Sequence, residues 1–549
     1  MIRIYTYVMI LLCLFLVMGT RMLFGQDVKN RYDRSALTVI FTQYGSEYEH
    51  EFRKALGQNK AIIPERFFDN QTKVVRLSGV QKSNTAKVDA METYFSEVNQ
   101  GNKIVAQWFG FDPKTGFDLK TIFDRAEYNA TDEEILVSRA SKRGKARIRD
   151  FGRELVQNSY VLVIDMYQIN KKTQENENDP YGWCGNFNYS LFKLQFDEEE
   201  INKLYDLWVY PEDSDSLKKQ KIEAFQELSF PLNHVETEKW LSASGMNYFA
   251  ALDDEVSYDE LFSKLIQNSV NNALDDIARD FPKFQVQAKI SSIRPLKAKI
   301  GKKESLKTDH RYFVYEYVWD EQEKQAIPER KAIVRARNIV DNRQIASGIS
   351  QESTFYQVYG GTVHEGMTLV EKRDLGLSLL GGYSSQGMED YTLRAFYRTG
   401  PFTGVPSLYI IGDLAFDKED YTFQYNGGLE DDYQFFSYKA GLGKGWRMFR
   451  IIEIMPYALY GRESVEVEDT EYATNLIKGG IYGGMHLLNN IAVYGEINYT
   501  MIIGEGLEKD GEVFDAMDEG LEWGDLFLDE VNQGREGDMS VEIGLRIDF

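Results

Sequence analysis

Charged residues of both signs recur through the C-terminal third of the chain, each alternating with apolar neighbours. Because side chains of a β-strand alternate between two faces, these residues would share one face of a sheet. They are Arg394, Arg398, Asp413, Lys439, Glu453, Lys478, Glu496, Glu542, Arg546 and Asp548. Inside a closed sheet they would pair into a network that fills the bore. The alternative is an ion pathway through the same charges.

Catalytic signatures are missing from the sequence. It has no Gly-x-Ser-x-Gly, His-Glu-x-x-His or P-loop motif, and its histidines lack metal-ligand spacing. Asp165 ends an apolar run, where an α/β domain could hold an acid, but a lone carboxylate assigns no reaction. The acidic segment from Glu505 to Glu536 offers oxygen ligands for Ca²⁺ without EF-hand spacing, which favours a solvated loop. We predict a non-enzyme with no catalytic residue, cofactor or metal site.

Composition and the first residues indicate an exported protein of several domains. The chain has 549 residues and a formal charge of −23, which argues against nucleic-acid binding. Residues 1–26 are typical of a signal peptide: Arg3 is followed by an apolar core from Val8 to Met18. That core is shorter than the ~20 residues that a membrane-spanning helix needs.

Residues 374–549 carry a repeated alternation that predicts eight antiparallel strands of a membrane β-barrel. The predicted strands begin at Leu375, Tyr391, Leu408, Phe436, Ile452, Ile477, Val493 and Asp538. Their even number and their length of about ten residues suit an outer-membrane barrel. Connections are short around 448–450 and 489–490 but long and acidic at 417–434, 463–474 and 504–538. A periplasmic β-sandwich is the alternative, but it would not require even strand number, loop asymmetry and export signal together.

The last strand, Met539 to Phe549, has one wholly apolar face and ends on an aromatic residue. Over residues 375–549 the chain resembles the eight-stranded outer-membrane β-barrel families. In those families the barrel-assembly machinery recognises a final strand of this kind. The resemblance implies an assembly signal at Leu545, Ile547 and Phe549, with outer-membrane lipid and that machinery as partners.

Residues 27–285 mix helical and strand patterns and predict a periplasmic α/β domain. Expected strands cover 37–41, 103–109, 160–166, 190–196 and 284–290; expected helices cover 47–56, 85–98, 142–155, 217–228 and 258–281, and a turn is expected at 181–185. A long helix that leads into a strand, after earlier strand–helix pairs, favours an open α/β layer. The order of elements is loosely similar to periplasmic domains of the curli-secretion and flagellar T-ring families.

Residues 286–373 predict a small β-domain that joins the two larger parts. Four or five short strands with polar turns cover 312–318, 332–336, 354–358 and 367–370, which suggests an SH3-like barrel. The pattern resembles the small C-terminal β-domain of the flagellar T-ring family.

The leading hypothesis is therefore a non-enzymatic outer-membrane protein of a Gram-negative bacterium. Its barrel would anchor a periplasmic module that interacts with other envelope proteins, in cell-envelope structure or assembly. One alternative is a periplasmic enzyme or ligand-binding domain tethered by the barrel. The other alternative, a small-solute channel, requires conductance in planar bilayers.

Overall fold

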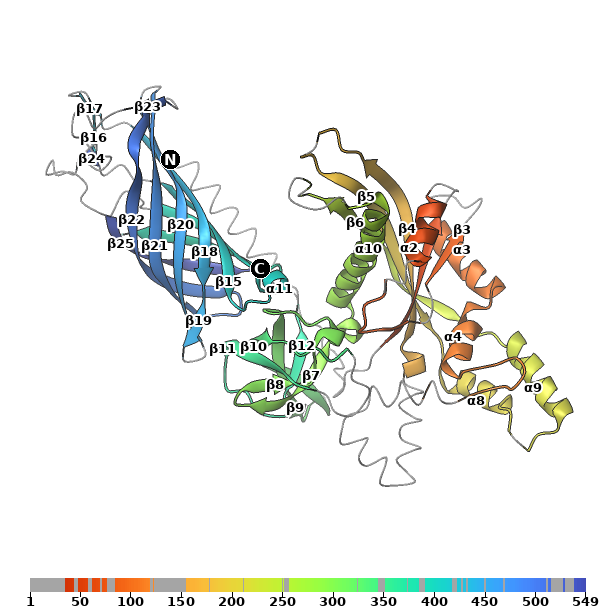
Figure 1. Cartoon of the computed structure of the whole chain (residues 1–549). Coiled ribbons are helices and arrows are strands. Elements are labelled where there is room, and N and C mark those ends of the chain that lie inside the picture. Colours follow the sequence, from red (N-terminus) through yellow and green to blue (C-terminus); the bar gives the residue numbers. More distant parts are fainter. Residues whose placement is uncertain are drawn as a thin grey trace.

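The structure, a computed structural model, has three units that follow one another along the chain (Figure 1). It describes residues 35–43, 48–57, 62–69, 72–76, 84–118, 122, 155–176, 178–210, 212–248, 250, 256–322, 324–343, 351–372, 374–384, 391–416, 422–425, 428–430, 433–448, 451–467, 470–509, 512–514, 527–528 and 538–549. The predicted signal peptide, most of the helix expected at 142–155 and most of the acidic segment lie outside these residues. Among the described helices, none is both long enough and apolar enough to cross a membrane.

The first unit is built on a mixed sheet of strand order β2-β1-β4-β5-β6, with β3 also paired to β1. Its strands are β1 (Ala36–Gln43), β2 (Phe68–Asp69), β3 (Lys73–Arg76), β4 (Ser159–Lys172), β5 (Tyr181–Leu194) and β6 (Leu232–Asn247). Strand β1 runs parallel to β2, β3 and β4, whereas β4, β5 and β6 are antiparallel. The turn expected at 181–185 is wrong, because these residues begin β5 and pair with β6.

Helices cover both faces of this sheet. The helices are α2 (Glu49–Gly57), α3 (Asn84–Glu97), α4 (Gln100–Trp108), α8 (Glu198–Asp206), α9 (Asp215–Glu227) and α10 (Tyr258–Asp280). Within β1, Leu37 and Val39 pack on the α2 and α10 side, whereas Ile40 packs on the α3 and α4 side. The Ser257 hydroxyl accepts a hydrogen bond from the Glu260 backbone N–H and caps α10.

The strand expected at 103–109 is wrong. These residues belong to α4, whose side chains Ile104, Val105 and Trp108 are buried against the sheet. Positions i, i+1 and i+4 also lie on one face of a helix, so a short apolar run does not separate the two structures. The Trp108 indole donates a hydrogen bond to the Ser159 hydroxyl (2.8 Å), which ties α4 to β4.

The second unit is a small closed barrel of six strands in the order β10-β11-β8-β7-β12-β9. Its strands are β7 (Gln287–Ile293), β8 (Leu296–Ala298), β9 (Arg311–Asp320), β10 (Gln325–Asn338), β11 (Ser353–Gly360) and β12 (Thr368–Glu371). The short strand β8 was not expected from the sequence. It follows a turn at Arg294-Pro295 and pairs with β7 and β11, which closes the barrel.

The third unit is a closed antiparallel barrel of eight strands, and all eight predicted strands are present. They are β13 (Leu377–Ser384), β14 (Tyr391–Arg398), β15 (Leu408–Phe416), β18 (Gln434–Lys444), β20 (Ile452–Val467), β21 (Thr470–His486), β22 (Ile491–Lys509) and β25 (Asp538–Asp548). The final strand β25 pairs with both β22 and β13, so the last strand closes on the first.

The ends of this barrel differ. At the end near the small barrel lie the helix α11 (Gly400–Thr403), the short strand β19 (Trp446–Met448) and the turn at 487–490 (Figure 1). The short strands β16 (Thr422–Tyr425), β17 (Gly428–Glu430), β23 (Glu512–Phe514) and β24 (Phe527–Leu528) lie at the far end. The long loop expected at 463–474 is wrong, because β20 and β21 stay paired from Glu463–Thr474 to Val467–Thr470.

Two neighbouring glycines of β13 give a matched test of the closing seam. A Cβ atom on Gly382 would overlap the Glu542 carboxylate and the Tyr494 hydroxyl, whereas a Cβ on Gly381 meets nothing within 4 Å. We expect Gly382→Ala to lower the free energy of unfolding by about 1–3 kcal/mol through overpacking. Gly381→Ala should leave it nearly unchanged. Unfolding of both variants in detergent micelles checks this, and equal losses would contradict the register of the seam.

Candidate functional site

The eight-stranded barrel places its charged and apolar side chains on opposite faces. Along β14, Arg394 and Arg398 are buried inside, whereas Leu393 and Tyr397 are exposed outside. The same alternation continues on the other strands. Buried inward charges include Asp413, Lys439, Glu453, Lys478, Glu496, Glu542, Arg546 and Asp548. The lumen thus holds every charged residue that the alternation assigned to it.

Arg394 is the centre of a first ion-pair cluster in the lumen. Its guanidinium contacts Asp413 at 2.6 and 2.7 Å and Glu542 at 3.4 Å, and it also pairs with Glu496. Two of these carboxylates also accept hydrogen bonds from hydroxyl groups: Tyr457 donates to Glu496 (2.7 Å) and Thr392 donates to Glu542 (2.6 Å). One guanidinium therefore holds three carboxylates that come from β15, β22 and β25.

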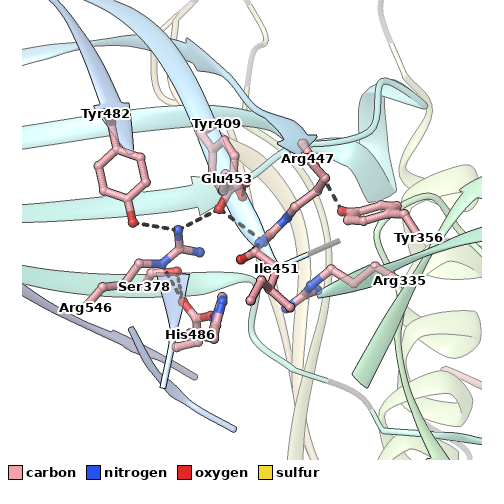
Figure 2. Close-up of polar contacts among 12 residues, drawn as sticks. Arg335, Tyr356, Ser378, Tyr409, Arg447, Ile451, Glu453, Tyr482, His486 and Arg546 are labelled. Atoms are coloured by element: carbon pink, nitrogen blue, oxygen red, sulfur yellow. Dashed lines mark hydrogen bonds and ion pairs between the residues drawn. The ribbon is translucent and has the colours of Figure 1, made fainter. Parts of the chain in front are cut away.

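Arg546 is the centre of a second cluster, nearer the small barrel (Figure 2). It pairs with Glu453 (3.0 Å) and Asp548 (2.7 Å) and donates to the Tyr482 hydroxyl (3.3 Å). Glu453 also pairs with Arg447 at 3.2 Å. Further hydrogen bonds reach these acids from Tyr409, Ser378 and His486.

Aromatic and aliphatic side chains pack across the bore beside these clusters. One contiguous cluster contains Leu380, Phe396, Tyr409, Ile411, Met455, Tyr457, Leu459, Tyr482 and Tyr494. The Tyr482 and Tyr494 rings stack at 5.4 Å, and the Phe396 ring meets Tyr482 edge-on at 5.5 Å. An eight-stranded barrel is only wide enough for its side chains to fill, and these side chains occupy it.

Three of the predicted lumen charges lie outside the two clusters. The Arg398 guanidinium lies over the Tyr409 ring (4.7 Å to the ring centre). The Lys439 ammonium donates to the Ser437 hydroxyl (2.6 Å). Lys478 is also buried, on β21. The hydroxyl donors of the network were not predicted. The alternation along the strands could have identified them, because they occupy inward positions: Tyr409, Tyr457, Tyr482 and Tyr494.

The predicted assembly residues lie at the small-barrel end of the closing strand. Leu545 is exposed on the outer face, and Ile547 stands opposite Leu379 and Ile491. The Phe549 backbone N–H donates to the Leu377 carbonyl (2.9 Å), and its carbonyl accepts from the Leu375 N–H (3.1 Å). The last residue of the chain is thus hydrogen-bonded to the first strand of the barrel.

The small barrel is joined to the mouth of the large one by buried polar contacts. The Asp309 carboxylate accepts hydrogen bonds from the Ser407 backbone N–H (2.7 Å) and from the Tyr356 hydroxyl (2.8 Å). Arg335 pairs with Asp374, which directly precedes the large barrel. Figure 2 shows Arg335 and Tyr356 facing Arg447 of the large barrel. Burial alone would raise the pKa of Asp374, but Arg335 and Arg311 outweigh it and hold that pKa below its ordinary value.

A further buried pair joins the small barrel to the α/β unit. Arg66 contacts Glu371 at 3.4 Å, and the Glu371 carboxylate also accepts from the Val286 backbone N–H (3.2 Å). Burial raises the pKa of Glu371 above its usual range, and the Arg66 charge offsets this only in part. The three units are therefore connected by ion pairs that are shielded from solvent.

Asp165, the acid considered in the sequence analysis, lies buried in the sheet. Its carboxylate accepts a hydrogen bond from the Thr42 hydroxyl (2.9 Å), and it stands opposite Thr42 in the β1–β4 register. Across the described segments, no group of three or more His, Cys, Asp or Glu side chains is placed to hold a metal ion.

Removing Arg394 should destabilise the large barrel strongly. In Arg394→Met three buried carboxylates lose their shared cation, so we expect a loss of about 3–5 kcal/mol in the free energy of unfolding. Adding Glu496→Gln to this variant removes one of the stranded charges and should recover about 1 kcal/mol or more. Denaturant unfolding in micelles measures both effects; simple additivity of the two substitutions would speak against the cluster.

His310 should make the junction sensitive to acid. Burial, aided by the Lys307 charge, lowers its pKa from 6.5 to about 4, against the weaker opposing effect of Asp374. Between these values the unfolded chain binds more protons, so stability should fall as pH drops from 6.5 to about 4. We expect a loss of about 2 kcal/mol, below the full value for this shift because the ring is partly exposed.

The matched variant for this test is His310→Gln, which keeps a polar side chain and removes the titration. Asp374 and Glu371 also titrate in acid, but they are common to both proteins and cancel in the difference. Unfolding of the full chain at several pH values should show a shallower pH dependence in the variant. Parallel curves would refute the role of His310.

Comparisons with known proteins return structural likeness only. No family model matches the chain, and no curated protein matches it. A major outer membrane protein from Thermus thermophilus is 13% identical, with a TM-score of 0.23, over 32% of this chain and 98% of that one. Yersinia pestis Ail is 13% identical, with a TM-score of 0.18, over 32% and 97%. The Escherichia coli outer membrane protease OmpT is 10% identical, with a TM-score of 0.16, over 48% and 97%. At these TM-scores the likenesses add nothing to the barrel seen in the chain itself.

Proposed function

We propose that this is an outer-membrane protein of a Gram-negative bacterium, whose closed barrel anchors a periplasmic interaction module. The observation that carries the proposal is the inside-out barrel: apolar side chains face outward and charged ones face inward. Exposed outward residues include Leu379, Leu393, Ile410, Leu442, Ile481, Ile497, Val541, Ile543 and Leu545. A soluble protein would expose such a band to water at high cost, whereas a bilayer accepts it.

The asymmetry of the barrel ends supports an orientation. Outer-membrane barrels have short turns on the periplasmic side and longer connections outside. The connections 399–407, 445–451 and 487–490 lie at the mouth that the small barrel covers (Figure 1). The short strands of the two longest connections, 417–433 and 510–537, lie at the opposite end, where β20 and β21 are joined by residues 468–469 alone. In this orientation the α/β unit and the small barrel are in the periplasm.

The filled lumen and the buried junction support a structural role in this proposal, and we keep the expectation that the protein is not an enzyme. Because side chains fill the lumen, the barrel serves in this proposal as an anchor and not as a channel for solutes. The α/β unit then supplies the surface for periplasmic envelope proteins. Strand β6 ends the described sheet, and its Trp240 is 61% exposed. An exposed tryptophan on an edge strand suits a contact with another protein chain.

Membrane fractionation and crosslinking in intact cells test the proposal together. The mature protein should sediment with the outer membrane, and a photo-crosslinker at Trp240 should capture periplasmic envelope proteins. The same crosslinker at Lys289, an exposed residue of the small barrel, is the matched control. A mature protein recovered as a soluble periplasmic species would overturn the proposal.

Deletion of Phe549 tests the role assigned to the end of the chain. It removes the aromatic end residue and its two backbone hydrogen bonds to the start of the barrel. We expect a several-fold drop in heat-modifiable barrel, because the closing strand loses both its end pairing and the assembly signal. Phe549→Tyr keeps an aromatic end and should assemble normally. Normal barrel levels after the deletion would count against the signal.

A further inference from the structure

A cavity of about 590 Å³ lies where the three units meet. Arg66 of the α/β unit, Arg335 of the small barrel and Arg398 of the large barrel all line it. Its volume is in the range of small-molecule sites.

The charge of the lining differs from that of the whole protein. Seven basic side chains line the cavity: Arg66, Lys302, Lys307, Arg311, Arg335, Arg343 and Arg398. Five acidic side chains line it: Glu65, Asp275, Asp309, Glu371 and Asp374. The cavity is thus net positive in a chain of formal charge −23.

Most of these charges have partners: Arg66 pairs with Glu371, and Arg311 and Arg335 pair with Asp374. Lys302 and Arg343 pair with Asp341, which does not line the cavity. Among the described contacts, Lys307 and Arg398 form no ion pair.

Arg398 is a buried cation of the cavity lining whose two terminal nitrogens lack hydrogen bonds among the described residues. It is 2% exposed. The Tyr409 ring faces its guanidinium but offers no acceptor oxygen to these nitrogens. A buried charged donor without an acceptor is costly, so such a group points to an anionic ligand that the chain itself does not supply.

The rim of the cavity is apolar and faces outward. Leu375 and Phe402 line the cavity and are 72% and 74% exposed. Tyr397 lines it too, with its ring stacked on Phe402 at 6.5 Å. These residues continue the outer face of the large barrel. The lining therefore passes from buried cations to exposed apolar groups, which matches an amphiphile with an anionic head.

We infer that this cavity binds the phosphate headgroup of an anionic phospholipid. The phosphate lies between Arg398 and Lys307, and the acyl chains lie along Leu375 and Phe402 on the outer face of the barrel. Arginine suits phosphate because its planar donors match the phosphate oxygens. This inference rests on the proposed membrane position of the barrel. Lipid bound here would hold the three units together at the membrane surface.

The test uses the full-length protein in nonionic detergent and native mass spectrometry. The probes are short-chain phosphatidylglycerol, short-chain phosphatidylcholine and inorganic phosphate. We expect one retained phosphatidylglycerol per chain and weaker retention of the other two. Arg398→Gln and Lys307→Glu should each weaken phosphatidylglycerol binding about tenfold, the effect of one lost charged hydrogen bond. Lys307 is exposed, so its variant should fold even where Arg398→Gln does not.

Lys289→Gln is the matched control, because Lys289 is an exposed cation of the small barrel outside the cavity. It should bind as the parent does. Equal retention of the two lipids, or unchanged binding in Lys307→Glu, overturns the inference. Binding of inorganic phosphate with no added retention of lipid overturns it as well, since the ligand is then a free anion. If the protein fractionates with the outer membrane yet fails these tests, only the lipid site is lost and the proposed function stands.

Discussion

The pairing of buried charges inside the eight-stranded barrel is the constraint on which the rest of the molecule depends. Arg394 stands opposite Asp413, and Asp413 stands opposite Lys439, so opposite charges alternate across three neighbouring strands. A register slip of one residue would turn each of these side chains to the outer face. Charge on that face is costly wherever it meets hydrocarbon. The lumen charges therefore specify the register as well as fill the bore.

The same kind of interaction joins the three units. Asp309, Asp374 and Glu371 each lie between two units and each is satisfied by partners from both sides or by a buried arginine. Removing one partner leaves a buried charge without its counter-charge. The resulting loss of stability is larger than the stability that a surface ion pair contributes. The junction consequently favours one arrangement of the units over a loose tether. A module held in this way presents its far surfaces at a defined distance from the barrel.

Sequence reasoning succeeded where one physical periodicity dominates. The barrel strands could be predicted because apolar and polar residues alternate along each of them. The prediction of a strand at 103–109 was wrong because Ile104, Val105 and Trp108 fit one face of a helix as well as a strand. Strands β20 and β21 are longer than predicted. Their outer part, which includes Glu463 and Thr474, is polar and has the composition of a loop, so the sequence predicted a loop there. The lumen tyrosines that donate hydrogen bonds also follow the alternation, but only the charged residues at inward positions were chosen as network members.

The buried contacts that join the three units could not be predicted from any local sequence pattern. Asp309 and Ser407 are 98 positions apart, and Arg66 and Glu371 are 305 apart, so nothing in the neighbourhood of either residue names its partner. The composition around Lys307 to Arg311 marks only a polar turn. Only the tertiary structure brings that segment into contact with the barrel mouth. Among the described residues it leaves the two terminal nitrogens of Arg398 without an acceptor. A buried guanidinium whose terminal nitrogens lack acceptors can be recognised only when its tertiary neighbours are known, which is why the cavity emerges from the structure and not from the sequence.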